Sequence, residues 1–168
     1  MNETQEHFDL DESPSPTPAN RLNTSPQQTL MVARIIWGAL LMGQFAFLGV
    51  VAFLLNGGFE ANVEVGQLVF YAAIAALLTG VPTGYVIRMQ TYKKHWRENV
   101  ITPQGYMAGN IILLAICEGA SILGLIATLL SGAFGLPLAV CGLAMGVQIV
   151  NFPNGKPMFE SLEDASPQ

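Results

Sequence analysis

Long apolar stretches without charged side chains constrain the fold of this chain more than any other feature. The sequence contains four of them, at about 30–55, 68–87, 107–130 and 134–150. About 20 consecutive apolar residues allow a helix to cross the hydrocarbon core of a bilayer, so each stretch is predicted to be a transmembrane helix. The fourth is short, and is expected to thin the bilayer locally or lean on its neighbours. The predicted fold class is all-α, a polytopic membrane protein with four transmembrane helices.

The composition agrees with a membrane location. Only 11% of the residues are charged and 51% are hydrophobic, whereas a soluble domain has about 25% charged residues. Polar segments flank the four stretches. Residues 1–28 are predicted to be a disordered polar leader, 29–152 the transmembrane domain, and 153–168 a flexible cytoplasmic tail. No cleavable signal peptide is recognised, so the first helix is expected to act as its own targeting signal.

The basic residues predict the orientation of the chain. With four spans, all seven Lys and Arg residues fall on one side of the membrane. The loop 56–67 and the turn 131–133, on the other side, contain none. The positive-inside rule then places both termini and the loop 88–106 in the cytoplasm. This pattern is typical of a multi-pass protein of the bacterial plasma (inner) membrane.

The loop 88–106 is basic and contains aromatic residues. Basic side chains beside a cytoplasmic leaflet attract anionic lipid, so this loop is predicted to anchor the protein to anionic lipid at the cytoplasmic face. Docking of a specific protein or lipid head group is the alternative. The basic residues concerned are Arg88, Lys93, Lys94 and Arg97.

The first and third stretches resemble each other. More than half of the positions are identical when residues 47–59 are aligned with 122–134. A duplicated helical hairpin would explain this similarity, and the four helices are therefore predicted to form two tandem hairpins in the same orientation. The alternative is chance similarity between two helices rich in Leu, Gly and Ala.

Glycine pairs four residues apart are predicted to be helix-packing sites. Without a hydrophobic driving force between helices in lipid, small residues that allow close backbone approach favour association. Pro82, within the first of these pairs, is expected to kink its helix and free a backbone carbonyl. The pairs are Gly80 with Gly84, Gly105 with Gly109, and Gly142 with Gly146.

Glu118 is the only charged residue between residues 107 and 130. A carboxyl group at the centre of a transmembrane helix is costly and often marks an ion or proton path. Gln44 lies at nearly the same predicted depth. In a structural interpretation, a neutral Glu118 donates a hydrogen bond to Gln44 or to a backbone carbonyl. In a functional interpretation, Glu118 is a proton-binding site that loads and unloads.

Polar residues follow one face of the same helix. Asn110, Cys117, Ser121 and Thr128 form a stripe at helical spacing, and Glu118 is rotated from Asn110 and Ser121 by roughly 60–80°. The sequence thus predicts one lightly polar face on this helix.

Residues 115–130 resemble the carboxylate helix of the proteolipid ring subunit (subunit c) of rotary proton-translocating ATPases. That helix has a mid-membrane Glu, small residues after it, and often a Gly six positions on, which Glu118 and Gly124 match. The vacuolar branch of the family is a duplicated hairpin with four spans and one carboxylate. The resemblance implies that Glu118 is a proton carrier and that Gln44 is its lapsed counterpart.

No catalytic pattern is recognised in the sequence. It lacks a nucleophile paired with a base, a metal-ligand spacing and a phosphate-binding loop, and Cys117 and Cys141 are interpreted as small core residues. We expect a non-enzymatic scaffold or accessory membrane subunit without metal, cofactor or nucleic acid, which forms a homo-oligomer or joins a membrane complex. The alternative is a proton-binding or proton-translocating subunit that uses Glu118.

Overall fold

The computed structural model describes residues 25–97, 99–132 and 134–159, which are mostly helical. Two short strands, β1 (Trp96–Arg97) and β2 (Val100–Ile101), form an antiparallel hairpin that pairs Trp96 with Ile101. The helical elements are α1 (Pro26–Asn56), α2 (Val63–Ala75), the π-helical turn η2 (Ala76–Gly80), α3 (Val81–Lys94), α4 (Pro103–Ser131), α5 (Leu136–Val150) and α6 (Lys156–Phe159).

Three helices are long and apolar enough to cross a membrane: α1, α4, and the continuous helix Val63–Lys94 that α2, η2 and α3 form together. This finding confirms the predicted helical class and fits the predicted membrane location. The fourth predicted span corresponds to α5, which has 15 residues and is therefore about 22 Å long, shorter than the roughly 30 Å of a bilayer core. A fourth crossing by α5 alone is thus not confirmed.

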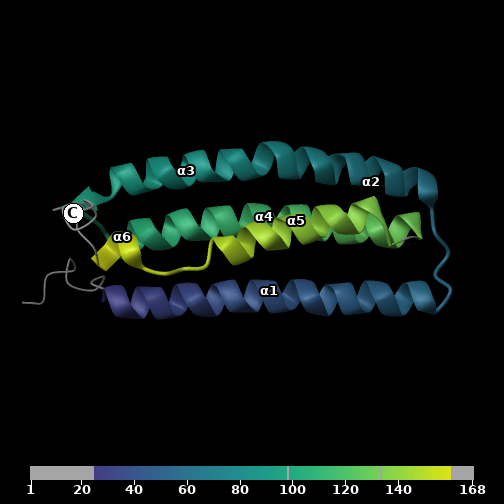
Figure 1. The fold of residues 1–168 in the computed structure, drawn as a ribbon, viewed down its shortest axis with the longest axis horizontal. Coiled ribbons are helices and arrows are strands. Elements are labelled where there is room, and N and C mark those ends of the chain that lie inside the picture. Colours follow the sequence, from purple (N-terminus) through teal and green to yellow (C-terminus); the bar gives the residue numbers. More distant parts are fainter. Residues whose placement is uncertain (1–24, 98, 133, 160–168) are drawn as a thin grey trace, which may run out of the picture.

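The helix α4 lies at the centre of the structure. Helix α1 and the helix α2–α3 pack against opposite sides of α4, and α5 packs along a third face (Figure 1). In the most apolar 18-residue stretch of α4, half of the residues are buried inside the bundle. In each of the other two long helices the corresponding share is 11%. Since α1 and α2 are separated by α4, the predicted pair of tandem hairpins is not confirmed, although α4 and α5 do pack against each other.

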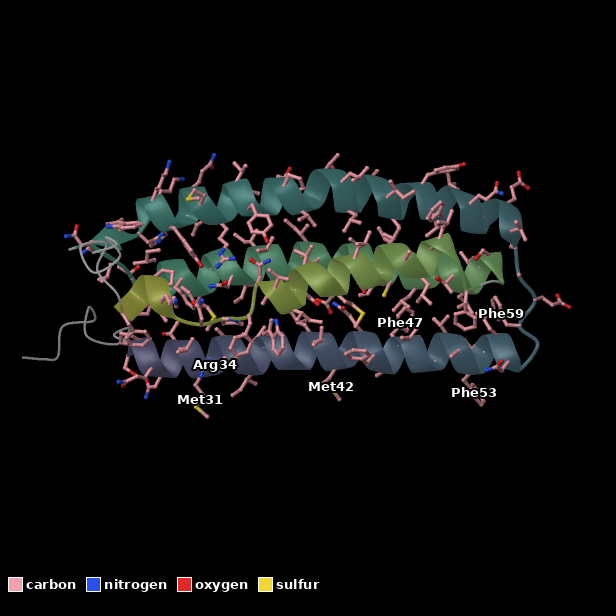
Figure 2. The ribbon with its side chains drawn as sticks, viewed as in Figure 1. Met31, Arg34, Met42, Phe47, Phe53 and Phe59 are labelled. Atoms are coloured by element: carbon pink, nitrogen blue, oxygen red, sulfur yellow. The ribbon has the colours of Figure 1, made fainter. Side chains whose placement is uncertain are left out.

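Large apolar side chains cover the outer face of α1. Met31, Met42 and Phe53 point away from the other helices (Figure 2), and between 65% and 76% of each is exposed. A continuous exposed apolar surface of this kind is typical of contact with lipid rather than water. The arrangement therefore fits a membrane location.

Capping groups set the helix ends several residues beyond the apolar stretches. The Ser25 side chain accepts a hydrogen bond from the Gln28 backbone N–H, so α1 includes residues 26–28, which the sequence placed in the leader. Thr102 caps α4 in the same way. Gly132, with φ 69°, follows the end of α4. Predictions for residues 1–24 and 160–168 fall outside the described residues.

The distortion expected at Pro82 takes the form of the π-helical turn η2. Proline has no N–H, so the Leu78 carbonyl loses the hydrogen bond that an α-helix would provide. Just before the proline, the helix widens over Ala76–Gly80. The hydroxyl of Thr83 donates to the Thr79 carbonyl over 2.6 Å and so supplies an additional local hydrogen bond.

The basic segment differs from the loop that the sequence predicted. Helix α3 continues to Lys94, and the hairpin β1–β2 then leads directly into α4. The segment after α5 also differs from a flexible tail, because Pro153 and Met158 are buried. Met158 packs in a cluster with Ala33, Tyr92, Ile101 and Tyr106. Residues 151–159 thus extend the short α5 along the bundle towards the start of α1 (Figure 1).

Candidate functional site

A chain of amide hydrogen bonds crosses the middle of the bundle. The Nε2 atom of Gln44 on α1 donates to Oε1 of Gln148 on α5 over 2.9 Å. The Nε2 atom of Gln148 in turn donates to the Leu114 carbonyl of α4 over 3.3 Å. Both glutamines are at most 2% exposed. Gln148 was not among the predicted site residues, although it is the only amide side chain within α5.

One acceptor among these hydrogen-bonded amides has no partner. The Oε1 atom of Gln44 is buried without a hydrogen bond. Nearby, the Trp37 indole N–H donates to the Gln148 carbonyl over 2.9 Å, which holds the end of α5 against α1. The glutamine pair therefore joins three helices through polar contacts at one level of the bundle.

Glu118 lies at the same level but does not join the amide chain. It is one helical turn beyond Leu114, whose carbonyl accepts from Gln148. The side chain is half-buried, and within the described residues its carboxyl group has neither a hydrogen-bond nor an ion-pair partner. The hydrogen bond between Glu118 and Gln44 that the sequence suggested is absent, because the Gln44 amide is directed to α5.

The predicted polar stripe of α4 is buried between helices. Asn110, Cys117, Ser121 and Thr128 are all at most 3% exposed. The Ser121 hydroxyl lies 3.1 Å from the Cys141 sulfur on α5, while Thr128 donates to the Gly124 carbonyl within α4. The contact between Ser121 and Cys141 holds α4 against α5. Glu118 lies on a different face from this stripe.

Four of the predicted packing glycines lie in helix contacts. A Cβ atom on Gly80 would be 2.9 Å from Ile116, and one on Gly84 would be 3.0 Å from Leu113. Cβ atoms on Gly105 and Gly109 would come closer still to the side chains of His95 and Tyr92, respectively. In contrast, nothing lies within 4 Å of such an atom on Gly142 or Gly146. This last pair therefore forms no contact within the chain.

The basic end of the bundle contains a second polar cluster. The Nε atom of Arg88 donates to the Tyr92 hydroxyl over 3.0 Å, and its Nη1 atom donates to Oδ1 of Asn151 over 2.9 Å. The Asn151 amide donates to the Tyr85 hydroxyl. Arg88 was predicted to face lipid from a loop, but it binds the chain just after α5. Lys93, Lys94 and Arg97 are exposed.

Arg34, on α1, binds the residues that follow α5, which Arg88 binds from α3. Its Nε atom donates to the Pro153 carbonyl over 3.2 Å, and its guanidinium group lies 5.4 Å from the centre of the Phe152 ring. The Trp37 and Phe152 rings meet edge to face, 5.0 Å apart. Two arginines from α1 and α3 thus hold residues 151–153 in place.

One face of α4 remains open along much of its length. Its exposed residues recur every three or four positions: Gln104, Ala108, Ile111, Ala115 and Gly119. We call this set the open face of α4. The first three of these residues also line a groove of about 450 Å³ between α1 and α4, together with Thr29, Val32, Pro103 and Met107. Glu118 adjoins the open face beside Gly119.

The described residues contain no cluster of three or more His, Cys, Asp or Glu side chains that could hold a metal ion. No protein-family model matches the sequence, and comparisons with curated proteins and with solved structures also find no match. The geometry of the bundle therefore provides the basis for a functional proposal.

Proposed function

We propose that this protein is a non-enzymatic accessory subunit or scaffold of a membrane complex. The observation that supports this role is the open face of α4. This helix contacts every other long helix, yet it leaves a row of residues exposed halfway across the bundle, of which Ala108, Ala115 and Gly119 are small. Because small residues allow the close approach on which helix association in lipid depends, such a face suits another transmembrane helix.

The orientation that fits this role has both termini in the cytoplasm of the plasma membrane. The described cations gather where α1 begins and α3 ends, while Glu60 and Glu64 lie at the opposite end of the bundle. By the positive-inside rule the basic end is cytoplasmic. There the exposed Lys93, Lys94 and Arg97 are available to anionic lipid, each contributing about 1 kcal/mol.

Photo-crosslinking in native membranes tests the accessory role. A photoreactive residue at Ala115 is expected to yield a discrete protein adduct, because Ala115 lies on the open face of α4. The matched control is Ala46, an equally small exposed residue on α1, which is expected to crosslink to lipid only. Adducts of the same kind from both positions, or lipid alone from both, would contradict the proposal.

A proton-binding subunit is the second candidate function. It is favoured by one observation: the half-buried Glu118 carboxyl has no partner within the described residues. A carboxyl group inside a transmembrane helix often marks a proton path, and the resemblance to the rotary-ATPase proteolipid implies the same role. If this function is correct, Glu118→Gln abolishes proton flux into liposomes while the protein stays folded, and carbodiimide labels Glu118 in the unmodified protein. Unchanged flux in Glu118→Gln rules it out.

A further inference from the structure

We infer that the open face of α4 binds a transmembrane helix of another protein that has a Lys or Arg at mid-depth, and that this cation pairs with Glu118. The inference rests on the proposed accessory role and adds the chemistry of the partner. Three features of the bundle support it: the shape of the open face, the position of Glu118, and the distribution of cations.

The shape of the open face suits one helix. On the other side of α4, α5 already packs between the neighbouring helices so closely that a Cβ atom on Gly124 would lie 2.9 Å from the Cys141 backbone nitrogen. The open face is the comparable surface without a helix. Ala115 and Gly119 are its two residues closest to the middle of α4, and nothing lies within 4 Å of where a Gly119 side chain would begin.

The position of Glu118 makes the partner's chemistry specific. The residue lies near the middle of α4 and is half-buried beside the open face. A carboxylate at this depth is costly unless an opposite charge or hydrogen-bond donors satisfy it. The side-chain amides of Gln44 and Gln148 do not do so, because their N–H donors are directed to Gln148 Oε1 and to the Leu114 carbonyl.

The part of the chain that the structure describes supplies no cation at that level. The described cations are all at the basic end of the bundle, and the two that lie deepest are held there: Arg34 by the Pro153 carbonyl and Arg88 by Asn151. The described part of a second copy would present another unpaired Glu118 and again no cation at this level. Two facing carboxylates repel each other, so a different protein with a basic residue fits better than a self-association.

A binding assay with synthetic helices tests this inference. The labelled full-length protein is reconstituted into lipid vesicles with Leu/Ala helices of about 21 residues that have either Lys or Leu at the centre. Energy transfer reports association. We expect the Lys helix to bind at least about tenfold more tightly than the Leu helix, since hydrogen bonds to charged groups are the stronger ones. Glu118→Gln should remove this preference.

Matched variants separate charge from shape and folding. Glu118→Lys is expected to reverse the preference, so that a helix with a central Glu binds instead. Gly119→Leu should block every helix by filling the open face, whereas Ala46→Leu on the exposed side of α1 should block none. Glu64→Gln removes an exposed acid at the other end of the bundle and should change nothing. Helical content measured by circular dichroism verifies that each variant is folded.

Two results would overturn the inference. If the Lys and Leu helices bind equally and Glu118→Gln has no effect, the open face accepts helices by shape alone, and the accessory role stands without the charged partner. If neither helix binds but copies of the protein associate through Ala115, the occupant is a second copy. Loss of the Ala115 crosslink described above would instead contradict the accessory role itself.

Discussion

Gln44 on α1 and Gln148 on α5 are joined by a 2.9 Å hydrogen bond between their side-chain amides. Helix α1 otherwise has few contacts with α5, since it packs mainly against α4. Because Gln148 also donates to the Leu114 carbonyl, its amide connects three helices. In lipid no water competes for these groups, so the contact helps to set which faces of the helices meet.

Replacing Gln148 with Leu is expected to destabilise the bundle by about 1–2 kcal/mol, because it leaves the buried Gln44 donor without its acceptor. The measurement is the free energy of unfolding in detergent micelles titrated with a denaturing detergent. The double variant Gln44→Leu/Gln148→Leu should cost less than the sum of the two single changes, as residues in direct contact are coupled. If the two single effects add up to the effect of the double variant, the hydrogen bond between Gln44 and Gln148 contributes no stability.

Gly124→Ala and Gly142→Ala are expected to act in opposite directions. A Cβ atom on Gly124 would lie 2.9 Å from both the Cys141 nitrogen and the Pro137 oxygen of the α5 backbone, which cannot move aside without displacing α5. We expect a loss of about 1–3 kcal/mol from this overpacking. Gly142 has open space, so alanine there should be neutral or stabilise by up to about 1 kcal/mol. Thermal unfolding in detergent compares the two.

Arg88→Lys is expected to loosen the segment after α5 although it keeps the charge. The Arg88 guanidinium group donates to Tyr92 and Asn151 at once, and a single ammonium group does not reproduce this fork. Cleavage between residues 151 and 159 by added protease should become faster, as it should in Asn151→Ala. The matched control is Lys93→Arg on the exposed side of α3. Equal cleavage rates in all four proteins would contradict this role of Arg88.

The orientation is testable with a membrane-impermeant maleimide. The natural Cys117 and Cys141 are buried, so we expect no labelling of the unmodified protein in intact cells. Asn62→Cys, at the start of α2, should be labelled from outside. Asn99→Cys, between β1 and β2, should react only after the cells are opened. Labelling of both positions in intact cells would place the two ends of the helix Val63–Lys94 on one side and contradict the topology.

The long helices could be predicted from the sequence because the length and hydropathy of a helix depend only on consecutive residues. The existence of α1, α4 and a helix through residues 68–87 followed from the absence of charge. Hydropathy could not reveal that α4 is the central helix. The most apolar part of α4 is about as apolar as that of α1, and the difference lies in which helix has small residues on several faces at once. Burial of this kind depends on packing between helices.

The polar contacts were harder to predict. Gln44 and Glu118 have similar depths, which suggested a contact, but the rotation of α1 about its axis directs Gln44 to α5. Gly49 and Gly124, which correspond in the alignment of 47–59 with 122–134, also differ in their neighbours. Gly124 is closely packed, whereas nothing lies within 4 Å of a Cβ atom on Gly49. Sequence similarity between the two helices therefore did not predict similar neighbours.

The contacts of Arg34 and Trp37 also determine when the protein can finish folding. Their acceptors, the carbonyls of Pro153 and Gln148, follow them by 119 and 111 residues. At synthesis rates of about 5–20 residues per second, the first helix waits roughly 5–25 s for these partners. A nascent chain that stops before residue 148 therefore leaves the indole and guanidinium groups of α1 without these acceptors.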